Sequence, residues 1–404
     1  MPWILRVILI VLPFVVLTHA YSFIRLYQLR LHLPFLNFRA YGWILGGLYA
    51  WWLLLPLVLL TTYFLGFQSQ VRGLLDGSSW MMDWFVVWPF WLGLLFSAEL
   101  LPLFLLGDIF SFVLKNTASG LYASWSVVRH SLIFGLAAFF FLYVPLRAIS
   151  DLSSNRVEEK TLSITNLPQG LTHFRIVHIS DVQADNRTTS KRMAGYIDQI
   201  NRLKPDVVLF TGDLITRGRE HIPAAAEMMG NIKARYGVFA VLGDHDYWTD
   251  PSMVRSLLQA HDVTLLEDTT VYLRVGEATL MVTAATHIYS KRLSVDQLKN
   301  LAADGQHADV RLFMVHQPAE ALVETAAREG YHAFLAGHTH GGQVVFWSWL
   351  YPFSPPRLET GYWRGYYRTG SMLVSINNGL GLTLAPIRYH SPASINLIIL
   401  SPAE

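Results

Sequence analysis

The segment 337–343, Gly-His-Thr-His-Gly-Gly-Gln, places two histidines, His338 and His340, in a loop rich in glycine. It follows the short apolar run 333–336, which is typical of a buried strand. Two imidazoles at a strand end can each turn a ring nitrogen toward a cation, and the glycines let the backbone approach a ligand closely. The segment therefore indicates metal binding, although a His-x-His pair also occurs by chance in surface loops.

Four earlier apolar runs, 174–179, 207–210, 238–242 and 312–315, also end in polar side chains. Those side chains are Asp181 and Gln183, Asp213, Asp244 with His245 and Asp246, and His316. Because open α/β sheets place their sites at the carboxyl ends of the strands, we expect these residues to meet at one edge of a sheet. Solvent-facing caps would not repeat in this way at five strand ends.

The elements that must position these residues follow residue 151, where short apolar runs alternate with amphipathic segments. This alternation is typical of an α/β domain. Helical spacing is found in 191–203, 224–235, 253–259 and 319–328. Further strands are expected at 161–165, 372–376 and 395–400, with a β-hairpin formed by 271–275 and 279–283. We expect this domain to cover residues 151–404.

Residues 1–150 have a different composition. Hydrophobic residues make up 52% of the whole chain and charged residues only 15%, an apolar excess for a soluble globule. The excess is concentrated in four runs that reach roughly the 20 residues needed to cross a bilayer. These runs are 3–20, 43–64, 85–106 and 131–149. We predict a four-helix transmembrane anchor over residues 1–150. A cleavable signal peptide is the alternative for the first run, but its charged n-region is missing.

Three further features allow alternative interpretations. Glu99, within the third apolar run, is either an intramembrane functional group or a residue of the bundle interior or a helix end. The aromatic segment 347–368 either contacts lipid or an amphiphilic substrate, or packs onto its own domain. Asp185 and Asp246 could be partners of ligating histidines, or ordinary loop and helix-cap carboxylates.

Composition excludes several classes of function. The chain has no cysteine, so any metal must be held by nitrogen and oxygen ligands and there can be no disulfide. The net charge is +2 without a basic run, so we expect no nucleic-acid partner.

The order of the motifs resembles that of the calcineurin-like metallophosphoesterases over about residues 160–400. The matching blocks are Asp181-x-Gln183, Gly212-Asp213, Gly243-Asp244-His245-Asp246, His316 and Gly337-His338-x-His340. The resemblance implies an α/β/β/α sandwich. Further blocks are similar to the membrane-associated bacterial branch, which includes hydrolases of UDP-2,3-diacylglucosamine and other phosphodiesterases. Those blocks are Tyr247-Trp248, Gly379-Leu-Gly381 and Pro386-Ile-Arg388.

The resemblance also implies two divalent cations, with Mn, Fe or Zn suited to mixed nitrogen and oxygen ligands. By that likeness, Asp213 would bridge the two ions. The first ion would take Asp181, Gln183, Asp213 and His340, and the second Asp213, Asp244, His316 and His338. His245 would contact the phosphate and could protonate the leaving oxygen.

Two positions depart from the family pattern. Gln183 stands where the family usually has His, and its neutral amide is a weaker ligand than imidazole. Asp244 stands where the family usually has Asn, and its charge should strengthen cation binding. The departures either shift the metal preference or mark a catalytically weakened protein that acts as a membrane binding or regulatory module.

We therefore expect a membrane-anchored dinuclear phosphoesterase that hydrolyses a phosphodiester, a pyrophosphate or a phosphomonoester, with a lipid-linked substrate as one alternative. It would be a multi-pass protein of the plasma (inner) membrane. Arg25, Arg30 and Arg39 favour a cytoplasmic first loop, and hence an extracytoplasmic catalytic half, whereas Arg147, Arg156 and Lys160 favour the reverse. The balance leans slightly outward, and the sequence does not indicate an oligomeric state.

Overall fold

The computed structural model describes residues 3–67, 77, 79–303 and 308–403. The chain forms two compact units. The helical unit comprises residues 1–150, 346–352 and 384–387. The sandwich unit comprises residues 151–345, 353–383 and 388–404. Two short segments from the second half of the sequence therefore belong to the helical unit.

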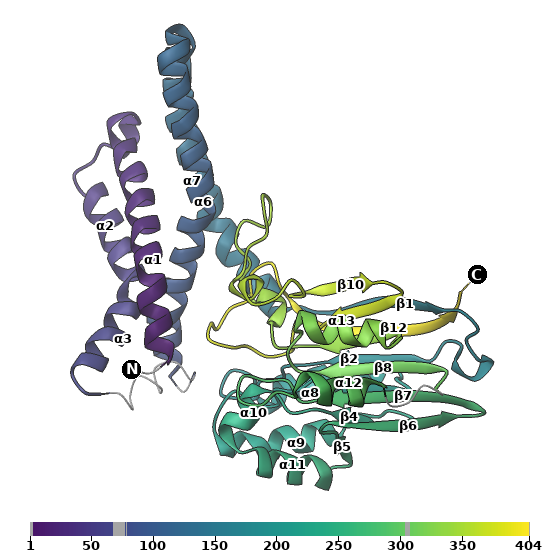
Figure 1. Cartoon of the computed structure of the whole chain (residues 1–404). Coiled ribbons are helices and arrows are strands. Elements are labelled where there is room, and N and C mark those ends of the chain that lie inside the picture. Colours follow the sequence, from purple (N-terminus) through teal and green to yellow (C-terminus); the bar gives the residue numbers. More distant parts are fainter. Residues whose placement is uncertain (1–2, 68–76, 78, 304–307, 404) are drawn as a thin grey trace. The chain divides into compact units, whose positions relative to one another are not determined.

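The helical unit contains apolar helices at all four predicted runs (Figure 1). Its main helices are α1 (Trp3–Gln28), α2 (Tyr41–Trp52), α3 (Leu54–Phe64), α6 (Trp88–Thr117) and α7 (Ser119–Ser153), with a short α5 (Trp80–Met82) and a π-helical turn (Asp83–Val87) before α6. Among the described residues, three helices are long and apolar enough to cross a membrane, or four if the bent pair α2 and α3 is one span.

The second predicted run is thus not a continuous helix. The pair α2 and α3 is bent by 51° at Leu53. Pro56 lies in the first turn of α3, where its ring removes the backbone N–H that a continuous helix would bond to the carbonyl of Trp52. The last helix also departs from its predicted start, because α7 begins at Ser119 rather than at residue 131. Its polar first turns include Arg129, which forms an ion pair with Asp108 of α6.

Glu99 of α6 is fully buried and receives hydrogen bonds from a distant segment of the same unit. Its carboxylate accepts the backbone N–H of Trp347 over 3.0 Å and the indole N–H of Trp349 over 2.7 Å. The indole of Trp347 donates to the carbonyl of Ala98. Glu99 is therefore a bundle-interior residue, and the first part of the aromatic segment packs on α6. Trp363, farther along that segment, is buried in the sandwich unit.

The sandwich unit consists of two six-stranded sheets. The first sheet has the order β1 (Asn155–Ile164), β12 (Ala393–Pro402), β2 (Arg175–Ile179), β3 (Val207–Phe210), β4 (Val238–Ala240), β5 (Val263–Leu265). The second has the order β10 (Gly365–Thr369), β11 (Met372–Ile376), β9 (Ala333–Ala336), β8 (Val310–Val315), β7 (Ala278–Ala285), β6 (Thr269–Val275). β2 to β5 run parallel, as do β7, β8, β9 and β11. The predicted hairpin is the antiparallel pair β6 and β7.

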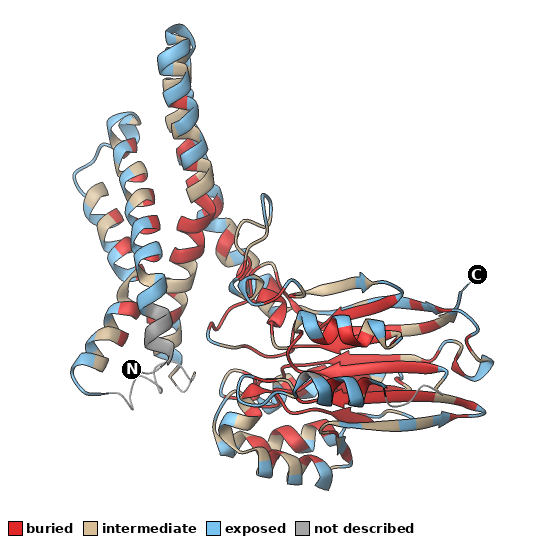
Figure 2. Ribbon diagram, in the orientation of Figure 1, coloured by how far each residue is buried: buried red, intermediate tan, exposed pale blue. Residues whose placement is uncertain are grey.

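Helices cover the outer faces of both sheets (Figure 1), and the central strands are buried (Figure 2). Apolar side chains fill the space between the two sheets. The first sheet is covered by α8 (Ser190–Arg202), α9 (Ile222–Gly230) and α11 (Pro251–Ala260). The second is covered by α12 (Val295–Ala303) and α13 (Glu320–Arg328). The inner layer joins residues such as Leu209 of β3 and Leu312 of β8. This arrangement confirms the predicted α/β/β/α sandwich.

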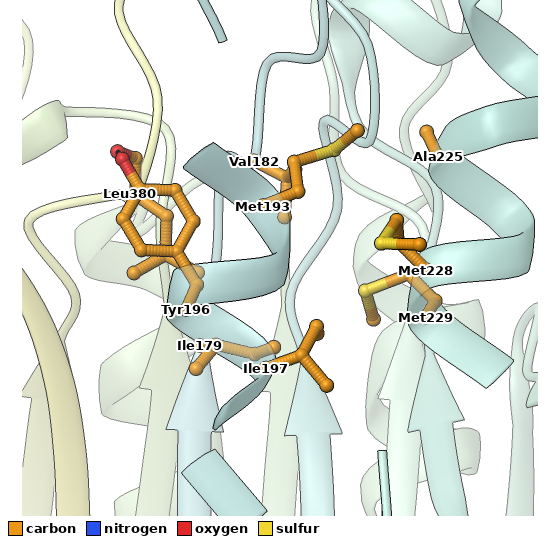
Figure 3. A pocket seen from close by; sticks show the side chains of 9 residues that line it. All are labelled: Ile179, Val182, Met193, Tyr196, Ile197, Ala225, Met228, Met229 and Leu380. Carbon is orange, nitrogen blue, oxygen red and sulfur yellow. Dashed lines mark hydrogen bonds between the residues drawn. The ribbon is translucent and has the colours of Figure 1, made fainter. Parts of the chain in front are cut away.

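The layer between α8, α9 and the first sheet is closely packed (Figure 3). Nine side chains surround a void of about 10 Å³, which is near the minimum for one water molecule. They are Ile179, Val182, Met193, Tyr196, Ile197, Ala225, Met228, Met229 and Leu380. The hydroxyl of Tyr196 donates to the carbonyl of Leu380 over 2.7 Å. This layer supports the strand ends and offers no room for a ligand.

Candidate metal centre

The five strand ends that carry the predicted ligands meet at one edge of the sandwich. His316, after β8, lies with Nε2 at 3.4 Å from Asp213 Oδ2 and 3.5 Å from Asp244 Oδ2. His338 Nδ1 lies 3.2 Å from Asp244 Oδ2, and His340 Nε2 lies 3.2 Å from Asp181 Oδ1. Residues separated by more than 150 positions in the sequence thus come within ligand distance of one another.

Two groups of three residues each offer ligand atoms that lie within 4.8 Å of one another. One group is Asp244, His316 and His338; the other is Asp181, Asp213 and His316. The two groups are adjacent, since His316 belongs to both and Asp213 and Asp244 flank it. Gln183 also reaches this edge, where its Nε2 donates to Asp213 Oδ2 over 2.8 Å.

Five of the predicted ligands adopt left-handed backbone conformations. The φ angles are 50° for Asp181, 49° for Gln183, 59° for Asp213, 68° for His338 and 51° for His340. Such values are uncommon outside glycine and persist only where the surrounding structure enforces them. Their concentration at one edge is typical of a functional site. These backbone conformations also direct side chains that follow different strands toward a common centre.

Glycines allow the loops to approach each other closely at two points. A Cβ atom at Gly243 would collide with the Asp213 carboxylate. A Cβ atom at Gly337 would collide with Ser180 and with Asp181 Oδ2. The glycines beside the polar residues are therefore required by the packing of the site.

The donor atoms fit a bound cation. Within the described part of the chain, the amide oxygen Oε1 of Gln183 is buried without a hydrogen-bond partner. Leaving a buried polar atom unpaired costs about 1–3 kcal/mol, so native proteins rarely keep such atoms without a function. Carboxylate oxygens, an amide oxygen and imidazole nitrogens gathered without sulfur are ligands suited to Mn, Fe or Zn.

Burial and mutual contacts shift the titration of these groups. Burial alone would raise the pKa of Asp244, but the contacts with His316 and His338 hold it well below its usual range. Burial would likewise lower the pKa of His316, but the charge of Asp213 and the hydrogen bonds with Asp213 and Asp244 raise it well above the ordinary value. Asp246 behaves differently, because burial, together with the charge of Asp213, raises its pKa to about 7. Negative charge is thus concentrated at this edge.

His245 lies beside the cluster and is held through two nitrogens. Its backbone N–H donates to Asp213 Oδ1 over 2.8 Å, and its Nδ1 lies 2.7 Å from the carbonyl oxygen of Thr216. Because a carbonyl oxygen only accepts, Nδ1 carries a proton, which leaves Nε2 as the nitrogen suited to proton transfer.

Asp246 and Asp185, the two candidate partners of ligating histidines, make different contacts. Asp246 accepts the backbone N–H groups of Asp213, Leu214 and Gly243, so it braces the loops that follow β3 and β4 rather than orienting a histidine. Asp185 accepts backbone N–H groups of its own loop, as expected for an ordinary loop carboxylate.

Sequence reasoning missed three residues at this edge. Gln317 donates from Nε2 to Asp244 Oδ2 over 2.7 Å, and Tyr289 and Glu359 contact His338. Gln317 could have been found, because it directly follows His316 at a strand end. No local motif marks Tyr289 or Glu359. His178 is fully buried within hydrogen-bond distance of Ser375 and Thr211, as expected for a core histidine.

Comparisons with known proteins show to which family the chain is related. The family model for calcineurin-like phosphoesterases matches residues 174–342. The uncharacterized metallophosphoesterase YkuE of Bacillus subtilis is 31% identical over 250 residues, which cover 60% of this chain and 84% of that protein.

A second relative, from Danio rerio, is named "Transmembrane protein with metallophosphoesterase domain". It is 26% identical, and the match covers 61% of this chain but only 58% of that protein. The crystal structure of a dimetal phosphatase from Danio rerio is 16% identical, with 57% of this chain and 93% of that chain covered and a TM-score of 0.36. From the family match and the Bacillus relative, we conclude that this chain belongs to the calcineurin-like metallophosphoesterases.

Proposed function

We propose that the protein is a membrane-anchored phosphoesterase that uses two divalent cations. Residues 1–150 would be the anchor and residues 151–404 the catalytic part. The observation that carries the proposal is the position of His316 Nε2, which faces Asp213 at 3.4 Å and Asp244 at 3.5 Å and thereby joins two adjacent groups of ligand atoms. A single structural cation would need only one such group.

The proposed ligands follow from these contacts and from the family likeness. Asp213 would be shared by both cations. The first cation would be held by Asp181, Gln183, Asp213 and His340, and the second by Asp213, Asp244, His316 and His338. When bound, such cations supply Lewis-acid stabilisation of the charge that develops on phosphoester oxygens.

The protein's own groups would bind the phosphate and move a proton. We assign His245 to the leaving group, because its backbone is tied to Asp213 while Nε2 is the nitrogen suited to proton transfer. The contact with the Thr216 carbonyl keeps the second proton of the imidazolium on Nδ1, so the proton that leaves would come from Nε2. A phosphodiester, a pyrophosphate and a phosphomonoester all present such a leaving oxygen.

The membrane setting is a separate part of the proposal. The apolar helices support a multi-pass membrane protein, which we place in the plasma (inner) membrane. A membrane anchor would bring the catalytic part close to lipid-linked substrates. Arg25 does not lie in the first loop, because it belongs to α1 and forms an ion pair with Asp108. It therefore does not support an extracytoplasmic position of the catalytic half. Arg30 and Arg39 still favour the extracytoplasmic side. A reporter fused after Glu404, active on only one side of the membrane, tests this placement.

A second candidate function is a binding or regulatory module with weak catalysis. It is favoured by Gln183, whose amide donates to the carboxylate that would bridge the cations. This hydrogen bond occupies a lone pair of Asp213 Oδ2 and lowers the charge available at the first cation.

Metal analysis and an aryl-phosphodiester assay on the full chain in detergent test both candidates. We expect about two equivalents of Mn, Fe or Zn and measurable hydrolysis, which Asp213→Asn and His340→Ala should each abolish. Two bound cations without turnover for any of these metals would favour the binding module. Absence of bound cations from the wild-type protein would contradict the proposed centre itself.

A further inference from the structure

His338 contacts a carboxylate through each of its ring nitrogens. Nδ1 lies 3.2 Å from Asp244 Oδ2, on the side of the candidate metal centre. Nε2 lies 3.4 Å from Glu359 Oε2. Because the two nitrogens point away from opposite sides of the imidazole ring, Glu359 lies behind His338 and cannot share its Nδ1 ligand position. Glu359 therefore contacts the histidine and not the position of a cation at Asp244.

Tyr289 completes this contact. Its hydroxyl donates to Glu359 Oε2 over 2.9 Å and lies 3.3 Å from His338 Nε2. Its backbone N–H donates to Asp244 Oδ1 over 2.7 Å. Its ring is parallel to that of Trp248, with centroids 6.2 Å apart. Tyr289 is therefore tied at its backbone to one proposed ligand and at its hydroxyl to the carboxylate behind another.

The backbone around Glu359 is also fixed, although the side chain is 54% exposed. The preceding turn begins after Ser354, which is fully buried and donates from its hydroxyl to the Gly342 carbonyl over 2.8 Å. The following residue, Thr360, donates from its hydroxyl to the Pro318 carbonyl over 2.7 Å. A glutamate that is simply solvated does not need a fixed backbone, whereas a carboxylate that positions one histidine nitrogen does.

We infer that Glu359, held by Tyr289, is a positioning residue that accepts the Nε2–H of His338 and so keeps the Nδ1 lone pair directed toward the proposed second cation. The inference rests on the proposed metal centre. An ionised carboxylate only accepts hydrogen bonds, so Glu359 selects the His338 tautomer with its proton on Nε2. Partners of this kind fix the ring orientation and raise the basicity of a ligating histidine.

Titration of the full-length protein in detergent with MnCl₂, followed by calorimetry, tests the inference. We expect Glu359→Ala to weaken one of the two Mn²⁺ sites by about 10- to 100-fold and to leave the other unchanged. Glu359→Gln should restore part of the loss, because its carbonyl oxygen can still accept the Nε2–H. Tyr289→Phe should have a smaller effect in the same direction, since it removes only the hydroxyl that holds Glu359.

Glu324→Gln is the matched control, because Glu324 lies on the surface of α13 and is 63% exposed. It should bind Mn²⁺ as the wild type does. Unchanged binding at both sites in Glu359→Ala would overturn the inference and leave the proposed function intact. Equal weakening of both sites with a lower unfolding temperature would also overturn it, since that result indicates a general structural role. A wild-type protein that binds no Mn²⁺ would instead overturn the proposed centre, and the inference with it.

Discussion

Gln183 donates a hydrogen bond from its amide nitrogen to Oδ2 of Asp213 over 2.8 Å, which places a neutral donor on the carboxylate proposed to bridge the two cations. The amide oxygen of the same side chain is buried without a hydrogen-bond partner. In the proposed centre, this orientation would offer one oxygen ligand while it reduces the charge available from Asp213. This contact is the structural counterpart of the departure from the family pattern at position 183.

Replacing Gln183 with histidine should strengthen cation binding at the first site. We expect Gln183→His to raise the affinity for Zn²⁺ or Mn²⁺ by about tenfold, because imidazole is the better ligand for these ions. Calorimetric titration of the metal-free protein measures the change. Gln259→His serves as the control, since Gln259 lies on an exposed face of α11. Weaker binding in Gln183→His than in the wild type would contradict the assignment of residue 183 as a ligand.

Loss of the His245 side chain should affect turnover but not metal content. We expect His245→Ala to lower kcat by about 10²–10⁴-fold, the usual contribution of general acid–base catalysis. The backbone N–H that donates to Asp213 remains in the variant, so the cluster should keep its shape. Steady-state kinetics and metal analysis on the same preparation provide the two readouts. Loss of both cations would show that the imidazole itself is a ligand.

Stability in acid should depend on His178. Burial lowers the pKa of His178 from its ordinary value of 6.5 to about 3. The folded protein therefore keeps this imidazole neutral, while the unfolded chain takes up a proton below pH 6.5. The stabilisation linked to neutral His178 is fully present above pH 6.5 and is lost as the pH falls toward 3, by about 1.4 kcal/mol per pH unit.

Thermal unfolding of the wild type and of His178→Asn between pH 7.5 and 4.5 checks this linkage. Asparagine can still hydrogen-bond Ser375 or Thr211 but does not titrate in this range. The variant's unfolding temperature should fall less steeply with acid than that of the wild type. Parallel curves would show that His178 is protonated to the same extent in the folded and unfolded chains.

The contact between Glu99 and Trp349 can be tested by proteolysis. Trp349→Phe keeps an aromatic ring but removes the N–H that donates to the buried carboxylate over 2.7 Å. Hydrogen bonds to charged groups contribute about 1.5–3 kcal/mol, so local opening of the segment 346–352 should become roughly ten to a hundred times more frequent. Chymotrypsin cleavage in this segment should accelerate accordingly. Trp43→Phe is the control, since Trp43 is 86% exposed, and equal cleavage of wild type and Trp349→Phe would contradict the role of the contact.

The sandwich and most of its candidate ligands could be predicted because their signals are local. The runs 207–210, 333–336 and 372–376 match β3, β9 and β11 residue for residue, since short apolar runs next to glycine and polar residues are typical of buried strands. Parallel strands bring their carboxyl ends to one edge of a sheet, which places Asp213 near Asp181 and Asp244 in the first sheet. His316 follows β8 of the second sheet, so its approach to Asp213 depends on how the two sheets pack.

The remaining features depend on tertiary contacts. Glu359 and Tyr289 meet at His338 although 70 positions separate them, and neither stands in a recognisable motif. Asp181 and His338 adopt left-handed conformations, which Asp and His tolerate better than most residues, but residue type alone does not predict at which positions they occur. The bend at Leu53 follows from Pro56, but composition alone could not distinguish one span from two short helices.

The segments 346–352 and 384–387 join the helical unit although the sequence on either side of them belongs to the sandwich unit. A single cut near residue 150 would therefore remove Glu99 while Trp347 and Trp349 stayed on the other fragment. A fragment that begins near residue 151 would contain the segments 346–352 and 384–387 without the rest of the unit to which they belong. Restoring such a fragment would require coexpression of residues 1–150, so that the two pieces could reassemble in the membrane.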